Sequence, residues 1–424
     1  MRKVTIGMLG LGNVGSGVWK VLQDMSQELM EQHQVQLNVK KILIRNLRMD
    51  RGLVLPEGIL TTAPEEVTDD PDITHVIECM GGEQPATDYM EKALKNGKTV
   101  ITANKMALAL NWRRLKGAAR EGKAGFYYEA SVGGAIPIIR VLNDSMQANR
   151  IDTVMGIVNG TTNYILSKMT DEKRPYEEVL KEAQELGLAE PDPRADVEGH
   201  DAAYKLSILS TLAFHKSVPY ESIYKEGISK IQVEDITAGR DLGFVLKLLA
   251  IGKKENGVMD VRVHPAFVQE NHPLATVSGA FNAVYLHGSA CGDMMLYGRG
   301  AGSLPTAGAM VSDLISSLDS SSFDAPDSAP ETLEQPAVTD NWRCGFYLRF
   351  SALNQPGVLG HITTKLGEHK VSISSIVQRE AVDETGVPVI VITHSANEKD
   401  VQAALLTIDP KIAQVISVLR VEGR

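Results

Sequence analysis

The sequence has few cysteines and no long apolar run. Cys79, Cys291 and Cys344 are odd in number and far apart. We therefore expect no disulfide framework, and we expect the protein to work in a reducing compartment. No segment approaches the roughly 18 apolar residues that indicate a membrane-spanning helix. The N-terminus enters a glycine-rich turn without the apolar region of a secretion signal. These features predict a cytoplasmic protein with no membrane partner.

The sequence also lacks an excess of basic residues. It has 43 Lys and Arg against 53 Asp and Glu, a net charge of −10, which argues against a dedicated nucleic-acid binder. Its ten histidines include no HExxH pattern, and no cysteine pair has zinc spacing, so nothing indicates a catalytic zinc.

The composition is that of an ordinary globular protein, with 43% hydrophobic and 23% charged residues among 424. At about 150 residues per domain, that length predicts two or three domains. Residues 316–340 are rich in Ser, Pro and Asp, which is typical of a linker. We therefore expect domains over 1–130, 131–315 and 341–424, with a linker over 316–340.

Each domain has its own expected pattern. Apolar runs alternate with helical patterns over 1–130, which predicts a Rossmann-type, doubly wound parallel sheet with helices on both faces; one of its helices is expected to begin with Asn111 as its cap. A mixed α+β pattern covers 131–315, with a strand over 151–158 and helices over 175–187 and 201–215. The last 80 residues read βαββαβ, the ferredoxin-like order.

A glycine-rich turn, GLGNVG, stands at 10–15 between the first apolar run and an amphipathic stretch over 16–32. In this context Gly10 permits the tight turn, Gly12 lets a pyrophosphate approach, and Gly15 lets helix and strand pack. Asn13 and Val14 belong to the helix start, whose free amides suit phosphate. The pattern predicts a dinucleotide site; the alternative is a purely structural turn.

Arg45 ends the second predicted strand, where an NAD-selective fold carries an acidic residue. An arginine there suits a 2′-phosphate, which favours NADP over NAD, with Arg48 and Arg51 as nearby alternatives. The other interpretation is a solvated basic turn.

Two further segments end in a lysine. Lys105 closes TANK, at the carboxyl end of a predicted strand, where ligands of open α/β sheets lie. Lys205 follows an acidic stretch and lies on the apolar face of its helix, four residues after Asp201. A lysine beside a carboxylate in a cleft can move protons; the alternatives are a surface lysine and a snorkelling lysine in a helix-face ion pair.

A glycine-rich run, GRGAGSLPT, covers 298–306. Through Gly302 its backbone could approach a cofactor, but for a lone loop of this kind a structural role is the favoured interpretation.

Together these motifs resemble homoserine dehydrogenase in its monofunctional form with a C-terminal ACT domain. The resemblance covers nearly the whole chain. It rests on GLGNVG, TANK, EASVGGAIPII (129–139), NGTTNYIL (159–166), EPDPRADVEGHDAAYK (190–205) and GRGAGSLPTAGAMVSDL (298–314).

The resemblance implies a reversible oxidoreductase that interconverts L-aspartate 4-semialdehyde and L-homoserine, a step towards threonine, methionine and isoleucine. It implies that Lys205 is the general acid/base with Asp201 as its partner, and that Lys105 contacts cofactor and substrate. Glu190 and Asp196 are implied in substrate binding. The middle domain is implied in dimerisation, and the protein is expected to be a homodimer or homotetramer.

The resemblance also implies two further ligands. Glu129, Val132, Gly134 and Ile136 match a monovalent-cation site that holds sodium through one carboxylate and backbone carbonyls. In the ACT domain, Asn354, Gly357, Val358 and Leu359 precede or open a helix whose amides suit an amino acid carboxylate. L-threonine is the implied effector, and a pairing module without ligand is the alternative.

Two other functions stay open on the sequence. One is a catalytically silent amino-acid sensor on the same fold, and the other is a different amino-acid semialdehyde dehydrogenase.

The linker is also expected to let the C-terminal domain pair with a second copy. Truncation after about Ser320 should then leave an active enzyme without an effector response.

Overall fold

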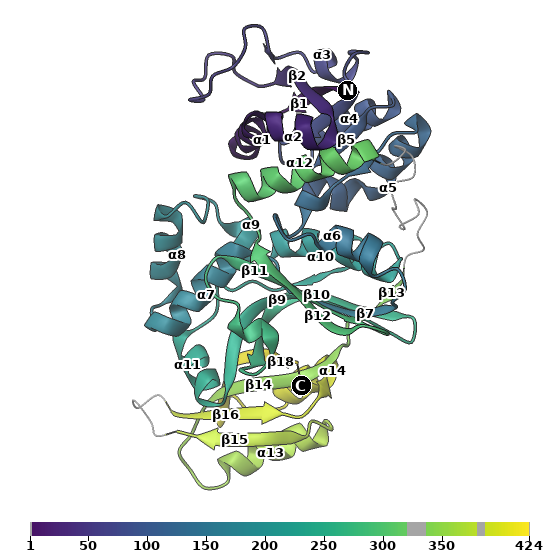
Figure 1. The fold of residues 1–424 in the computed structure, drawn as a ribbon. Coiled ribbons are helices and arrows are strands. Elements are labelled where there is room, and N and C mark those ends of the chain that lie inside the picture. Colours follow the sequence, from purple (N-terminus) through teal and green to yellow (C-terminus); the bar gives the residue numbers. More distant parts are fainter. Residues whose placement is uncertain (1, 320–335, 380–385, 424) are drawn as a thin grey trace.

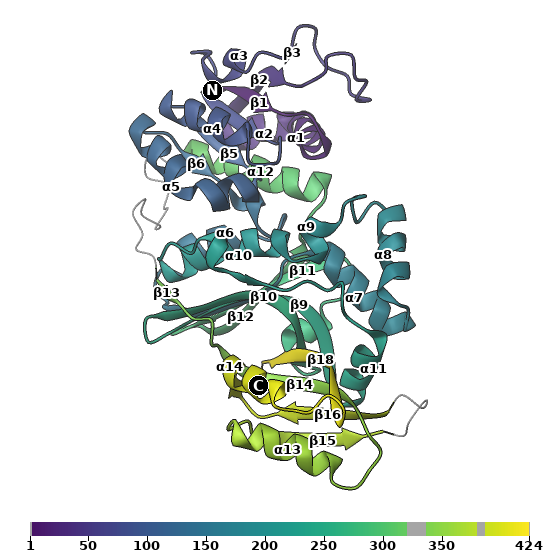
Figure 2. The ribbon, with the colours of Figure 1, turned by 180° about the vertical axis from the view of Figure 1, so that it is seen from behind.

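The computed structural model describes residues 2–319, 336–379 and 386–423. Three units follow one another along the long axis of the molecule, with the N-terminal unit at one end and the C-terminal unit at the other (Figures 1 and 2). In the described residues, no helix is both long and apolar enough to cross a bilayer.

The N-terminal unit is built on a parallel sheet with strand order β3-β2-β1-β4-β5-β6. This confirms the predicted Rossmann-type architecture, in which the order reverses direction between β1 and β4. Its strands are β1 (Arg2–Leu9), β2 (Val35–Leu43), β3 (Leu60–Thr61), β4 (His75–Glu78), β5 (Thr99–Thr102) and β6 (Phe126–Tyr127). Its helices are α1 (Asn13–Asp24), α2 (Ser26–His33), α3 (Glu65–Thr68), α4 (Ala86–Lys95) and α5 (Lys105–Gly122).

A helix from much later in the chain completes this unit. α12 (Ser303–Asp319) packs against α1 and lies along the N-terminal unit on its side towards the middle unit (Figures 1 and 2). Met310, Val311 and Leu314 are buried in the same core as Val18 and Leu22 of α1. The chain therefore leaves the N-terminal unit, forms the middle unit, and returns.

The middle unit is an antiparallel sheet of long strands with helices on one face. The short helix α6 (Ile138–Arg140) precedes its first strand. Its strands are β7 (Ile151–Ile157), β8 (Tyr224–Lys225), β9 (Phe244–Glu255), β10 (Val258–Gln269), β11 (Phe281–Gly288) and β12 (Gly292–Arg299). Its main helices are α7 (Gly160–Glu172), α8 (Tyr176–Glu185), α9 (Arg194–Val197), α10 (His200–Phe214) and α11 (Val233–Asp241). The hairpins β9–β10 and β11–β12 were not among the elements expected from the sequence. β9 and β10 are buried on both faces over most of their length, which removes the alternation that identifies a strand, whereas β12 does alternate in burial.

The C-terminal unit has the βαββαβ order that the sequence predicts. Its elements are β14 (Arg343–Ala352), α13 (Val358–Glu368), β15 (Ile373–Gln378), β16 (Val387–Thr393), α14 (Glu398–Leu406) and β18 (Ala413–Glu422), with the short β17 (Ala396–Asn397) before α14. The strand order is β18-β14-β16-β15.

One continuous sheet joins the middle and C-terminal units. β9 pairs with one edge of β10, and three short stretches pair in parallel along the other edge. These are β13 (Ala337–Val338) at Val258, β8 at Arg262, and β18 at Ala266–Val268. The C-terminal unit is therefore docked on the middle unit of its own chain through backbone pairing.

Three local expectations differ from the structure. The amphipathic stretch 16–32 is two helices, broken at Met25. α5 begins at Lys105 with Asn104 as its cap, and Asn111, expected to be the cap, is a kink inside it with φ −126° and ψ 29°. Within the expected linker 316–340, residues 316–319 continue α12 and 337–338 form β13; residues 320–335 lie outside the described part.

Candidate active site

The lysine and aspartate predicted as a pair meet on α10. Lys205 Nζ lies 2.7 Å from Asp201 Oδ2, one helical turn away, and donates to the carbonyl oxygen of Val158 at 2.6 Å. Both side chains are buried. Charged residues are rarely buried unless they are paired, so this pair is a built feature of the middle unit and not a surface ion pair.

The second lysine reaches the same carboxylate from the N-terminal unit. Lys105 Nζ lies 2.7 Å from Asp201 Oδ1. The Lys105 side chain is 42% exposed whereas that of Lys205 is 8% exposed. Asp201 thus contacts two ammonium groups, that of Lys205 from the middle unit and that of Lys105 from the N-terminal unit. The Lys105 side chain is the more solvent-exposed of the two.

The TANK segment explains how Lys105 is aimed. Thr102 ends β5 and donates through Oγ1 to the buried carboxylate of Glu78 on β4 at 2.5 Å, and its Oγ1 accepts the Asn104 amide at 2.9 Å. The Asn104 side chain then caps α5 by accepting the amide of Ala107 at 3.0 Å. Lys105 is therefore the first residue of a helix with a fixed start.

Asn159 is a member of this cluster that the sequence reasoning did not single out. Its Nδ2 donates to Asp201 Oδ2 at 2.8 Å and to Asp196 Oδ1 at 2.7 Å. Its Oδ1 accepts the Thr162 amide at 2.9 Å and so caps α7. The available signal was an Asn immediately before the helical pattern of NGTTNYIL, which is typical of a cap.

Burial and charge together set the protonation of the cluster. The negative charge of Asp201 raises the pKa of Lys105. Burial lowers the pKa of Lys205, and Lys105 lowers it further, against the opposing effect of Asp201. For Asp201, burial would raise the pKa, but the charges of Lys205 and Lys105 outweigh it and hold the pKa below its usual range. The cluster thus favours one lysine that stays charged and one that gives up its proton more easily.

The two remaining acidic residues flank this cluster. Burial raises the pKa of Asp196, and the charge of Asp201 acts in the same direction. Glu190 is exposed in the loop between α8 and α9, and its charge contributes to the raised pKa of Lys105. Both carboxylates therefore lie where a cationic group next to the lysines would be attracted.

The predicted dinucleotide turn has the geometry its glycines require. Gly10 has φ +102°, and a Cβ there would lie 3.0 Å from the carbonyl oxygen of Cys79. A Cβ at Gly15 would lie 2.5 Å from the carbonyl oxygen of Gly10, whereas nothing lies within 4 Å of one at Gly12. Asn13 and Val14 begin α1. The open side at Gly12 and the start of α1 form the cradle expected for a pyrophosphate.

A cavity of about 510 Å³ adjoins this turn, lined by residues that include Gly10, Gly12, Arg45, Arg51 and Tyr89. Arg45 follows the end of β2 and is exposed. Arg51 donates to the carbonyl oxygens of Met49 and Asn46 at 2.7 and 3.1 Å. Arg48 is not among the residues that line this cavity. Of the three arginines, Arg45 and Arg51 can therefore meet a ligand here.

The segments holding Gly302 and Glu129 lie side by side. Gly302 has φ +124°, and the Ser303 hydroxyl after it donates to the carbonyl oxygen of Asn13 at 2.5 Å. A Cβ at Gly134 would lie 2.7 Å from Gly300. The loop 298–303 thus links the start of α1 to the segment 129–136.

Glu129 is buried, and both of its carboxylate oxygens accept backbone amides at 2.8 Å, from Ile139 and Arg140. Burial raises its pKa. Val132 and Ile136 are buried, and Gly134 has φ +55°. Among the described residues there is no group of three or more His, Cys, Asp or Glu that could hold a metal ion; a site built mainly of carbonyls would not require one.

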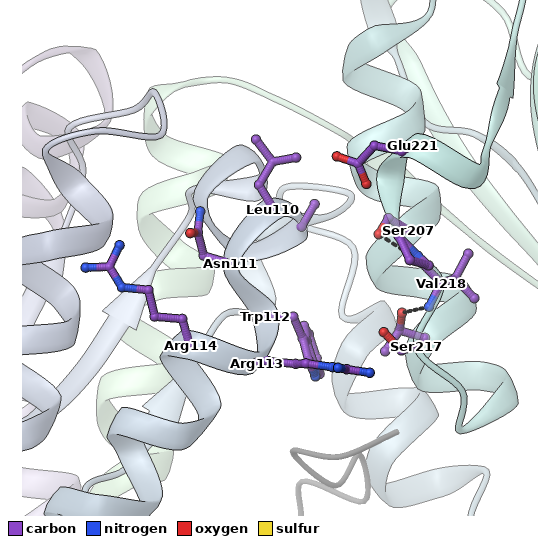
Figure 3. Close-up of a pocket in the computed structure, with 12 residues that line it drawn as sticks. Leu110, Asn111, Trp112, Arg113, Arg114, Ser207, Ser217, Val218 and Glu221 are labelled. Atoms are coloured by element: carbon purple, nitrogen blue, oxygen red, sulfur yellow. Dashed lines mark hydrogen bonds between the residues drawn. The ribbon is translucent and has the colours of Figure 1, made fainter. Parts of the chain in front are cut away.

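A separate hollow lies further along the α5–α10 contact. It has a volume of about 300 Å³ and is lined by Leu110, Ser207, Val218 and Glu221 among others. Figure 3 shows α5 on one side of this hollow and α10 with the segment 217–221 on the other. The Ser207 hydroxyl donates to the carbonyl oxygen of Val218 at 2.6 Å and so joins α10 to the segment 217–221 within the middle unit. The opposite wall, α5, belongs to the N-terminal unit.

The ACT loop is exposed at the far end of the molecule from the lysine cluster (Figure 1). Gly357 caps α13 with φ +93°, and a Cβ there would have nothing within 4 Å. Asn354 is exposed in the same loop, and Val358 and Leu359 open the helix and pack into the core of the unit. The start of α13 is therefore accessible to a ligand.

Three family models match the chain. The model described as homoserine dehydrogenase covers residues 137–315, and the NAD-binding domain of homoserine dehydrogenase covers 10–129. The model for the ACT domain covers 346–409.

Similar proteins carry the same name. The homoserine dehydrogenase of Bacillus subtilis is 40% identical over 430 residues, which cover 100% of this chain and 99% of the relative. The crystal structure of a homoserine dehydrogenase from Thiobacillus denitrificans has a TM-score of 0.93 at 38% identity, covering 100% of this chain and 99% of that one. A hyperthermophilic archaeal homoserine dehydrogenase in complex with NADPH has a TM-score of 0.65 at 26% identity, covering 76% of this chain and all of its own.

Proposed function

The chain belongs to the homoserine dehydrogenase family of oxidoreductases that act on a CH–OH group, and from this we propose how its own residues perform the reaction. Lys205 is the general acid/base in the interconversion of L-homoserine and L-aspartate 4-semialdehyde. The observation that carries this assignment is the carboxylate of Asp201, which contacts Lys205 and Lys105 at 2.7 Å each.

In the oxidation direction, neutral Lys205 accepts the proton of the homoserine hydroxyl, and in reduction protonated Lys205 returns it. Hydride transfer is the chemistry that the nicotinamide cofactor supplies when bound. The lowered pKa of Lys205 suits a group that must exchange protons near neutral pH. Lys105, which stays charged, polarises the carbonyl oxygen and orients it.

Asp201 and Asn159 position this pair. Asp201 fixes both ammonium groups, and Asn159 fixes Asp201 by donating to it at 2.8 Å. Glu190 and Asp196 bind the substrate through its ammonium group, which their position beside the lysines supports.

The cofactor is NADP in preference to NAD. The open side of Gly12 and the start of α1 fit a pyrophosphate, and Arg45 lines the adjoining cavity where a 2′-phosphate would lie. Gly302 closes the cradle from the opposite loop. Residues 1–130 thus serve cofactor binding, while 131–315 serve catalysis and dimerisation.

A monovalent cation, sodium, is bound by the segment with Glu129, Val132, Gly134 and Ile136. The fit rests on the buried carboxylate of Glu129, whose pKa is raised by burial, because a cation beside it would compensate the buried charge. Glu129 would supply one oxygen and the other three residues their backbone carbonyls.

The effector is L-threonine, bound at Asn354, Gly357, Val358 and Leu359, where the exposed start of α13 can receive its carboxylate. We further propose that the enzyme acts in threonine, methionine and isoleucine biosynthesis in the cytoplasm, as a homodimer or homotetramer.

One experiment tests the reaction. The absorbance of reduced cofactor is followed with NADP and with NAD, using homoserine and a panel of other hydroxy-amino acids. Turnover of homoserine, faster with NADP, is the expected result. Turnover of another hydroxy-amino acid in preference would indicate a different semialdehyde dehydrogenase. No turnover with any of them, together with threonine binding, would indicate a silent amino-acid sensor.

A further inference from the structure

Arg420 of β18 is a buried residue of the C-terminal unit that contacts the middle unit. Its side chain is 5% exposed and forms ion pairs with Glu226 and, at 2.9 Å, with Glu398. Glu398 begins α14 in the same unit as Arg420, whereas Glu226 directly follows β8 of the middle unit. The Arg420–Glu226 ion pair therefore crosses between the units.

The residues after Glu226 lie against the segment that leads into the active site. The Ile228 amide donates to the carbonyl oxygen of Val197, the last residue of α9, at 2.8 Å. A Cβ at Gly227 would overlap that carbonyl oxygen and would lie 2.6 Å from the Cα of Glu198. Only glycine permits this close approach.

The same contact includes the start of α10. Gly199, with φ +82°, precedes α10, and a Cβ there would lie 3.6 Å from the carbonyl oxygen of Glu226. Asp196 lies in α9 and Asp201 in the first turn of α10. A displacement of Glu226 is therefore transmitted by packed backbone to the segment that carries both aspartates, because close-packed atoms leave no space to absorb it.

We propose that Glu226 and Arg420 are positioning residues of the dehydrogenase reaction: their ion pair couples the C-terminal unit to α9 and α10, and so sets the placement of Asp196 and Asp201. The proposal rests on the proposed roles of Asp201 and Lys205. This proposal differs from simple docking of the C-terminal unit on the middle unit. If the ion pairs only held the two units together, any ion pair at the junction between the units would have the same effect on catalysis.

The junction supplies a matched control for that difference. Arg349 of β14 forms a two-pronged contact with the buried Asp235 of α11, with Nε–Oδ1 at 2.6 Å and Nη2–Oδ2 at 3.1 Å. This pair also crosses between the units, but it ends on α11 and not on the segment before α10. Docking alone predicts equal effects from both ion pairs, whereas positioning predicts an effect on catalysis from only one.

The experiment compares Glu226→Gln, Arg420→Gln and Asp235→Asn in the full chain. The first two should each lower kcat/KM for homoserine about tenfold, within the usual range of coupling between sites, with the KM for NADP unchanged. The double variant Glu226→Gln/Arg420→Gln should lose no more than the single ones. Asp235→Asn should change kcat/KM less than about twofold, although it lowers Tm. Equal losses from both ion pairs, or no loss from either, would overturn the proposal.

A second measurement does not depend on turnover. Hydrogen exchange at Ile228 and over 197–201 should speed up in Glu226→Gln and stay at the wild-type rate in Asp235→Asn. Absence of homoserine turnover in the wild type would contradict the proposed function, whereas unchanged exchange in Glu226→Gln would contradict the coupling.

With threonine as the probe, Glu226→Gln should keep a threonine-induced shift in Tm and lose inhibition; retained inhibition would count against the coupling.

Discussion

At the scale of single residues, the lysine cluster makes a sharp prediction about Lys205. Lys205→Ala should lower kcat about 100-fold or more, the usual scale of acid–base catalysis, with a much smaller change in KM for homoserine. The matched control is Lys247→Ala, which removes another buried lysine, on β9, that donates to the carbonyl oxygen of Val277 at 2.5 Å. The control should lower Tm but leave kcat near the wild-type value. Steady-state kinetics with near-normal turnover in Lys205→Ala would refute its role.

The charge on Asp201 predicts a shift in pH dependence. For homoserine oxidation Lys205 must be neutral, so kcat/KM should rise with pH as this lysine loses its proton. Asp201 raises the pKa of Lys205 against the larger effect of burial. Asp201→Asn should therefore move the rise in kcat/KM to lower pH, besides lowering its maximum. Asp192→Asn, an exposed carboxylate paired with Arg194 at 2.6 Å, should leave the position of the rise unchanged; an equal shift in both variants would contradict the argument.

The residues of this cluster differ in how far sequence could identify them. Lys205 and Asp201 share one helix, and their spacing of four predicts their contact directly. The contact of Lys105 with Asp201 depends on how two units pack, which no local pattern encodes. The resemblance implied only that Lys105 contacts cofactor and substrate. Asn159 could be predicted as a helix cap, but its bonds to Asp201 and Asp196 depend on the same long-range packing.

At the scale of elements, the end of β2 predicts cofactor preference. Arg45→Asp should raise the KM for NADP and shift preference towards NAD, because a carboxylate repels the 2′-phosphate and can bind a 2′-hydroxyl. Arg48→Asp is the matched control, since Arg48 is not among the residues lining the cavity. Kinetics with both cofactors measure the change. If the NADP/NAD ratio is unchanged in Arg45→Asp, Arg51, which lines the same cavity, becomes the candidate.

The start of α13 predicts where an effector carboxylate binds. Gly357 is a poor position to test because its φ of +93° strains any side chain. Gly360 is the third residue of α13, within its first turn, and a Cβ there has nothing within 4 Å. Gly360→Asp should abolish threonine inhibition by repelling the carboxylate, while its charge in the first turn stabilises the helix. Gly360→Ala should keep the response, measured as the threonine concentration for half inhibition; unchanged inhibition in Gly360→Asp would place threonine elsewhere.

Helices and strands were predictable where the hydrophobic periodicity or a helix-capping residue was clear. The parallel sheet of the first unit and the βαββαβ order of the last follow from apolar runs separated by helical patterns. A helix was expected to begin at Asn111 and to reach Gly122. Helical residues in fact begin at Lys105, and Asn111 is a kink that divides α5 into two helical segments, so this Asn precedes the second segment only. The β9–β10 hairpin was missed because burial on both faces of β9 removes the alternation that identifies a strand.

At the scale of the whole molecule, the continuous sheet modifies the expectation for truncation. A chain ending at Asp319 would lose β13 and β18 from the edge of β10 and would remove Glu422, which lies 2.7 Å from the fully buried Arg262. We expect this chain to keep measurable activity without a threonine response, with a clearly lower Tm, because a buried charge loses a partner. Thermal unfolding and the homoserine assay measure both. A truncated chain with wild-type Tm would show that the docked C-terminal unit adds no stability.

The return of α12 to the first unit has a mechanical consequence. The chain passes between the N-terminal and middle units twice, near Ala135 and near Arg299, and these two passages are bonded to each other through the Ala135 amide and the Arg299 carbonyl oxygen at 3.1 Å. Because the two chain passages lie at one point, the N-terminal and middle units can rotate relative to each other about that point without stretching either passage. The two passages therefore act as a single pivot. The Lys105–Asp201 contact closes the two bodies against each other elsewhere on the same boundary. We expect opening about this pivot to separate the two lysines while both sheets stay intact, which would make substrate entry and assembly of the lysine cluster one and the same movement.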